Sequence, residues 1–285
     1  MNFDKPKYRW LLLLFTIFAS ACSAGGDDLV LNLAAEFEKE VMKQERIASV
    51  EVREYEYAFG TFNEEDGGFL TEARTFDKNG DYLSLKTRDR LLPEYDLTIS
   101  RKLEHVSDER IKLYLYDENN ELESFTWITM EKGRDIEAIT FKPDSVYESR
   151  WTYEYDANGN LIQQALYGND EQIETRFVYG YNDIGERVEV RRFARDGSIE
   201  FRAVGKPLSR LKREWVDIDE NGKETVDFVY TYDELGRIKS KAFMGSASTE
   251  TTEYEYEGES SLIVKKIEYE NEEPYLMYKY SYTRW

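Results

Sequence analysis

The chain has 285 residues, of which 41% are hydrophobic and 15% aromatic, so it is long enough for one large folded domain or two modest ones and too apolar to be disordered throughout. Its formal net charge of −20 repels nucleic-acid phosphates, so we expect no nucleic-acid partner. The 22 tyrosines favour strands over helices, because a tyrosine is apolar at its base and polar at its tip.

Residues 1–21 have the layout of a secretory signal, with basic residues first, then an apolar run, then small residues. The apolar run is shorter than the roughly 20 residues that a membrane-spanning helix needs. We therefore predict a signal peptide that is removed.

The end of this signal, Ala19-Ser20-Ala21-Cys22, resembles a bacterial lipobox, in which cleavage occurs before the cysteine and that cysteine then carries the lipid. The alternative is an ordinary cleavage site with a coincidental cysteine. Because Cys22 is the only cysteine of the chain, we predict lipidation there and no internal disulfide. Ser23 resembles the sorting signal that sends such proteins to the outer membrane of a Gram-negative bacterium.

Two short segments follow the predicted anchor. Residues 22–28 are small and polar, which predicts a lipidated flexible tether. Residues 29–47 place Val30, Leu33 and Phe37 at helical spacing, which predicts an amphipathic helix. Such a helix could lie on a membrane surface, but the glutamates on its polar face favour packing against a sheet.

Residues 48–285 change to a period of two and contain a recurring unit of strand, turn and strand. In each copy two tyrosines share one face of a strand, an Asp or Asn opens the turn, and a Gly supplies a positive φ. The residues of this signature are Tyr153, Tyr155, Asp156, Gly159, Tyr179, Tyr181, Gly185, Tyr230, Tyr232, Asp233 and Gly236.

The length and the turn spacing predict a mainly β fold: a large antiparallel meander of roughly 16–18 strands at about 13 residues per strand and turn. A flat sheet of that width would leave one apolar face and two long edges uncovered. We therefore expect a curled wall or half-barrel, with the N-terminal helix against its concave side.

The units at residues 153–162 and 230–239 resemble the Tyr-Asp (YD) repeat of the Rhs family, with partial matches elsewhere in the chain. In full-length members of that family the repeats wind into a large shell around a toxin. The present chain has no room for such a shell or for a toxin domain. The resemblance therefore implies a short envelope lipoprotein built from degenerate YD repeats, and no toxin delivery.

The sequence favours a protein without catalytic residues or cofactors. His105 is the only histidine, and neither a serine-nucleophile elbow nor a Cys and His set for zinc is present. The 58 acidic residues would place many carboxylates in pairs by chance, so such pairs indicate nothing about glycoside hydrolysis.

One local pattern could bind a metal. Asp217, Asp219 and Asn221, followed by Gly222, match the first half of a calcium loop, in which alternate oxygens converge on the cation. The twelfth position is Phe228 rather than the expected Glu, so plain turn formation is the favoured interpretation.

Two functional hypotheses remain. The first is a non-catalytic cell-envelope lipoprotein whose tyrosine-rich sheet is a binding or scaffold module for an envelope protein or a glycan. The second is a carrier that holds a lipid or another apolar ligand between the curved sheet and the helix. In both, the lipid on Cys22 attaches the protein to the membrane.

Overall fold

The computed structural model describes residues 39–88, 97–245 and 249–285. These residues form 19 strands joined mostly by tight turns. The first ten are β1 (Ile47–Ala58), β2 (Thr61–Phe62), β3 (Phe69–Phe76), β4 (Tyr82–Thr87), β5 (Leu97–Ser107), β6 (Arg110–Tyr116), β7 (Leu122–Glu131), β8 (Arg134–Phe141), β9 (Tyr147–Tyr155) and β10 (Leu161–Tyr167). The remaining nine are β11 (Ile173–Tyr181), β12 (Arg187–Ala194), β13 (Ile199–Ser209), β14 (Lys212–Ile218), β15 (Glu224–Tyr232), β16 (Ile238–Met244), β17 (Thr249–Tyr256), β18 (Ile263–Glu270) and β19 (Glu273–Arg284).

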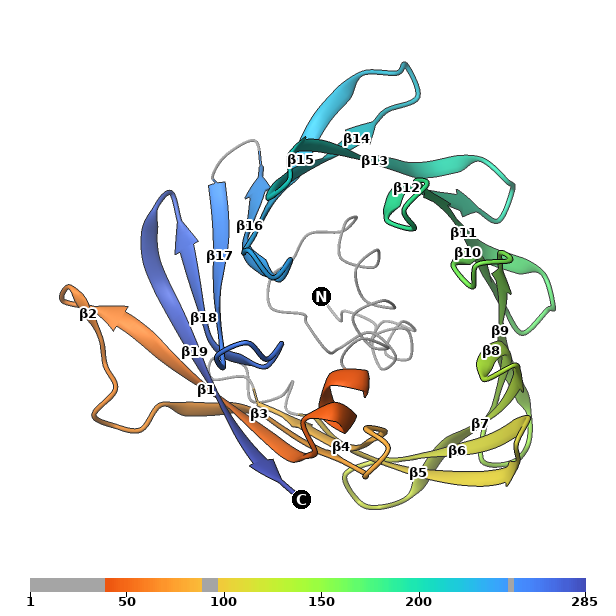
Figure 1. Ribbon diagram of the computed structural model, residues 1–285. Helices are drawn as coiled ribbons and strands as arrows, with labels where there is room; N and C mark the ends of the chain where they lie inside the picture. The colour runs from red at the N-terminus through yellow and green to blue at the C-terminus, as the bar shows by residue number, and fades with distance from the viewer. Residues whose placement is uncertain (1–38, 89–96, 246–248) are drawn as a thin grey trace, which may run out of the picture.

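The strands form a closed antiparallel barrel (Figure 1). From β3 onward each strand pairs with the next, and β1 completes the ring by pairing with both β3 and β19. β2 pairs only with the end of β1, so 18 of the 19 strands make up the ring. The prediction of a mainly β antiparallel meander is confirmed, whereas the expected open, curled wall was wrong. Closure pairs the two edges that an open sheet would leave exposed.

A short helix over residues 39–44 lies inside the ring (Figure 1). Its Val41 and Met42 are buried in one apolar cluster with Val50, Val52 and other residues of the wall. The chain then enters β1 directly, at Ile47. Most of the predicted helix, residues 29–38, lies outside the described residues, as do the signal and the tether.

The helix identifies the inner face of the wall. Residues paired directly across neighbouring strands share a face. Following these pairs from Val50 to each strand in turn shows which residues lie on the inside of the barrel. All six tyrosines of the repeat signature lie on this inner face: Tyr153, Tyr155, Tyr179, Tyr181, Tyr230 and Tyr232.

The wall is a single layer with only local cores. One buried cluster surrounds the helix, and a second contains Trp151, Leu166, Phe177, Tyr179 and Val190. Most other strand residues on both faces are half-buried. The sheet therefore offers aromatic surface on its inside and on its outside, instead of burying it all in one common core.

Candidate functional site

The signature turns are closed by their first side chain. Asp156 Oδ1 accepts hydrogen bonds from the backbone N–H of Asn158 (2.9 Å) and of Asn160 (2.8 Å). Gly159 N–H donates to Asp156 O at 3.0 Å and has a φ of 88°, the left-handed conformation that a side chain disfavours. Gly185 and Gly236 have φ values of 80° and 82° in equivalent turns. The residues chosen from the sequence thus carry the turn geometry expected of them.

In several of the units the second tyrosine bonds its strand to the preceding strand. The Tyr181 hydroxyl donates to Leu161 O at 2.8 Å, and the Tyr256 hydroxyl donates to Ile238 O at 2.7 Å. Tyr155 and Tyr282 make the same kind of bond to backbone carbonyls of β8 and β18. These hydroxyls occupy corresponding places around the barrel, which fixes neighbouring hairpins to one another.

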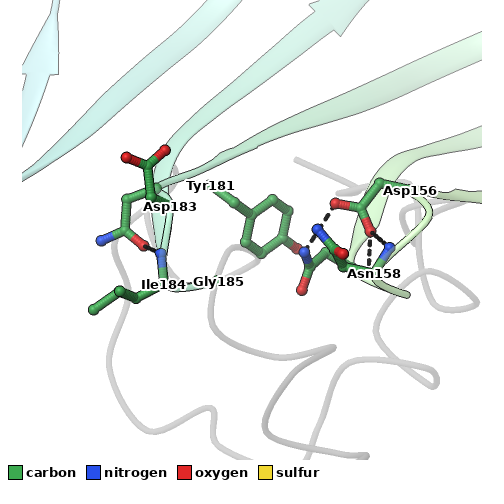
Figure 2. A pocket seen from close by; sticks show the side chains of 8 residues that line it. Asp156, Asn158, Tyr181, Asp183, Ile184 and Gly185 are labelled. Carbon is green, nitrogen blue, oxygen red and sulfur yellow. Dashed lines mark hydrogen bonds between the residues drawn. The ribbon is translucent and has the colours of Figure 1, made fainter.

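A polar pocket of about 620 Å³ lies between two adjacent turns, those of β9–β10 and β11–β12 (Figure 2). Its lining includes Asp156, Tyr181 and Asn182. Asn182 Oδ1 accepts from the backbone N–H of Ile184 and Glu186, and the Asn160 side-chain amide donates to Asp156 Oδ2 at 2.9 Å. The Asn160 amide, with the backbone N–H groups, lowers the pKa of Asp156. The polar groups of this pocket are thus engaged in turn formation, and we do not assign it a ligand.

The inner wall combines aromatic rings with cations. Arg187 Cζ lies 4.1 Å from the ring centroid of Tyr179, and Lys266 Nζ lies 3.8 Å from that of Tyr278. Lys241 lies over Phe228 at 4.4 Å in the same way. The three rings are buried, and contacts of this kind stabilise the cations that lie against them.

The outer wall carries a second aromatic group, which we call the outer patch: Tyr114, Phe125, Trp127 and Phe141 around Lys112. The patch spans β6, β7 and β8, and all five side chains are half-buried. Sequence analysis missed it. The available signal was the alternation of aromatic residues at positions 114 and 116 and at positions 125 and 127, but only the register of three strands brings these residues together.

The predicted calcium ligands occupy a turn of the same kind. Asp219 Oδ1 accepts from the backbone N–H of Asn221 (2.9 Å) and of Lys223 (2.8 Å), while Asp217 lies on β14. Within residues 39–88, 97–245 and 249–285, no group of three or more acidic, His or Cys side chains is arranged to hold a metal ion. Calcium binding by Asp217, Asp219 and Asn221 stays a prediction.

Two other sequence predictions can be located. Cys22, the predicted lipidation site, lies outside the described residues. His105 is exposed on β5. Among the described residues, no helix is long and apolar enough to cross a membrane.

Comparison with known proteins gives a weak likeness of fold. No family model and no curated protein sequence matches the chain. Among solved structures, a porin-like protein from Bacteroides uniformis is similar at 9% identity, over 83% of this chain and 98% of that one, with a TM-score of 0.47. A porin-like protein from Bacteroides vulgatus is similar at 9% identity, over 84% and 99%, with a TM-score of 0.36. TM-scores below 0.5 carry no functional argument.

The assignment to Rhs and YD-repeat proteins was wrong. No family model matches the chain, and two of the solved structures that resemble it are described as porin-like proteins. The physical reason is that Tyr-x-Tyr-Asp followed by Gly specifies a hairpin, and a hairpin can be a unit of many sheets. The motif therefore predicted local structure correctly and the family incorrectly.

Proposed function

We propose that the protein is a non-catalytic cell-envelope lipoprotein whose closed barrel is a rigid binding module. The observation that carries this proposal is the single-layer wall, which keeps aromatic side chains half-exposed on both faces and holds its hairpins together by hydroxyl hydrogen bonds. Rings presented on a rigid wall can bind a partner at little cost in conformational entropy. An envelope protein or a glycan is the partner class that suits such a surface.

The charges on the outer face support a barrel that stands in water. Arg191 and Arg202 are direct cross-strand neighbours there, and both lie near Glu189, whose Oε1 is 3.8 Å from Arg191 Nε and 2.8 Å from Arg202 Nε. A cation on the lipid face of a transmembrane barrel costs about 2–4 kcal/mol at mid-membrane. Strands such as β6 and β10 have 7 residues, whereas a membrane-spanning strand needs about 9–11.

Attachment to the membrane is then the role of the N-terminus. The signal layout and the single cysteine support a lipid on Cys22, and Ser23 supports the outer membrane of a Gram-negative bacterium as the destination. A lipid anchor also suits an acidic protein, because its charge gives no attraction to anionic headgroups.

The carrier hypothesis has less support. Val41 and Met42 of the helix are 8% and 6% exposed, so the helix sits directly on the wall. A ligand held between the helix and the sheet would have to displace these contacts. The binding module needs no such rearrangement.

The test of the anchor is the variant Cys22→Ala in the full chain. We expect loss of fatty-acid labelling and release of the folded protein into detergent-free buffer, because one lipid-bearing cysteine is the proposed attachment. A variant that stays in the membrane fraction at high salt would contradict the proposal.

The test of the binding role is mass spectrometry of what copurifies with the detergent-extracted native protein. A stoichiometric protein or glycan is the expected result. A bound lipid in its place would favour the carrier.

A further inference from the structure

The outer patch has a regular arrangement of rings. Phe125 and Phe141 are direct cross-strand neighbours with centroids 5.3 Å apart and an angle of 18° between their planes. Tyr147 on β9 extends the row, at 6.2 Å from Phe141. Strands are about 4.8 Å apart, so the row from β6 to β9 is roughly 14 Å wide. That width matches two or three sugar rings side by side.

A lysine stands at the centre of these rings. Lys112 Nζ lies 4.7 Å from the ring centroid of Tyr114, 4.3 Å from that of Phe125 and 5.1 Å from that of Trp127. In the part of the chain that the structure describes, no carboxylate forms an ion pair with Lys112. Glu104 of β5 is the direct cross-strand neighbour of Lys112 and accepts a hydrogen bond from the Tyr114 hydroxyl at 2.9 Å.

Two further cations border the patch. Arg110 Cζ lies 4.7 Å from the ring of Trp127, and Lys102 Nζ lies 5.8 Å from that of Tyr114. Counted with Glu104, the carboxylate that faces Lys112, these three cations leave a local balance of +2 in a chain of 58 acidic and 38 basic residues. This local charge is complementary to an anion.

The placement of the rings distinguishes between possible anions. The rings of the patch are half-buried against the sheet, and none is among the exposed large hydrophobic side chains of the described residues. Insertion into a bilayer needs rings that project from the surface. Half-buried rings that pack on one another, as Phe125 and Phe141 do, instead give an aromatic surface against which the apolar faces of sugars can pack.

We infer that the outer patch binds an anionic glycan, with sugars on Phe125, Trp127 and Phe141 and an acid group on Lys112. This inference rests on the proposed binding role and names its partner class. The uronic acids, which are sugars that bear a carboxylate, supply both an apolar ring face for the aromatic side chains and an acid group for Lys112.

The experiment is calorimetric titration of the full chain with oligogalacturonate, a chain of uronic acids, and with a neutral oligosaccharide of equal length. We expect binding of the acidic chain, weaker binding at high salt, and little binding of the neutral one. Trp127→Ala should weaken binding about tenfold or more, since central aromatic residues dominate such interfaces. Lys112→Gln, which keeps most of the packing of the side-chain stem, should weaken it several-fold.

The matched control lies on another part of the outer wall. Arg176 Cζ lies 4.5 Å from the ring of Phe193 on β12, so Phe193→Ala removes a similar contact away from the patch and should leave binding unchanged. Circular dichroism verifies the fold of each variant.

Three results would overturn the inference: no binding at millimolar oligogalacturonate, equal binding of the neutral chain, or unchanged binding in Lys112→Gln together with Trp127→Ala. Binding to anionic vesicles that Lys112→Gln abolishes, without glycan binding, would assign the patch to the membrane. These titrations do not depend on whether Cys22→Ala releases the protein from the membrane. The proposed anchor and the proposed glycan binding are therefore tested separately.

Discussion

At the scale of single residues, glycine is required for two different reasons in these turns. Gly80 has a φ of 80°, and a Cβ built on it would lie 2.2 Å from Lys39 O of the inner helix. Gly236 has a φ of 82°, and a Cβ built on it would have no atom within 4 Å. The first glycine is needed for conformation and for close approach, and the second for conformation alone.

This difference predicts a ranking of two substitutions. Gly236→Ala should lower the free energy of unfolding by about 1 kcal/mol, the cost of a side chain at positive φ. Gly80→Ala should cost about 2 kcal/mol or more, because the methyl group also displaces the helix. Urea unfolding followed by circular dichroism measures both. Equal losses in the two variants would show that the helix does not rest on this turn.

The calcium hypothesis is also decided at residue scale. Because Asp219 Oδ1 already accepts two backbone hydrogen bonds, we expect millimolar calcium to leave the melting temperature unchanged. A shift of several degrees that disappears in Asp219→Ala would instead establish a metal site, since a ligand of the folded state stabilises it by mass action.

At the scale of elements, the hydroxyls of Tyr155, Tyr181, Tyr256 and Tyr282 each hold a strand to the one before it. Burial raises the pKa of Tyr256 to about 12, and its hydroxyl donates to Ile238 O. Because the folded state holds this proton more tightly than the unfolded state does, the corresponding stability is fully present below pH 10. It is lost as the pH rises from 10 to about 12.

The variant Tyr256→Phe tests this contribution. It should lower the free energy of unfolding by about 1 kcal/mol at neutral pH, the usual net value of one hydrogen bond. The loss should shrink between pH 10 and pH 12, where the wild type itself loses the benefit. Tyr57→Phe, at an exposed tyrosine of β1, is the control and should change stability little at any pH. A constant difference across this pH range would mean that Tyr256 ionises as an ordinary tyrosine.

Local chemistry explains which elements the sequence could predict. Asp156, Asn158 and Gly159 are four or fewer residues apart, so their turn is specified by adjacent side chains. The period of two likewise predicted the strands and the shared face of Tyr153 and Tyr155. Neither signal tells which face lies inside, and neither aligns Lys112 with Trp127, because the register of separate hairpins is a property of the whole sheet.

At the scale of the whole molecule, the ring is closed by strands from opposite ends of the described chain. β1 pairs with β19 over nine residue pairs, among them Val52 with Tyr280 and Glu51 with Ser281. No local sequence pattern predicts a contact between residues more than 200 positions apart in the chain. The sequence therefore predicted a wall that curls, but not one that closes.

Closure predicts a specific cross-link. With Cys22 replaced by Ala, the pair Glu51→Cys and Ser281→Cys should form a disulfide under mild oxidation, because these residues are direct neighbours on the outer face. The bond should stabilise the fold by up to about 5 kcal/mol, since it closes a very long loop. Mobility on non-reducing gels detects it.

The control for this cross-link pairs Glu51→Cys with Glu255→Cys, which lies on β17. That pair should remain reduced under the same conditions. Equal cross-linking in both pairs, or none in the first, would contradict the closed ring.

The pairing of β1 with β19 also fixes the order in which the protein can be completed. Synthesis proceeds from the N-terminus, so β1 is present long before its second partner, and the growing sheet keeps an open edge until residues 273–284 have been made. A chain interrupted before β19 would retain two such edges, on β1 and on β18, and open edges recruit strands from other molecules. Premature termination or C-terminal proteolysis of this protein should therefore produce oligomers rather than a smaller soluble barrel.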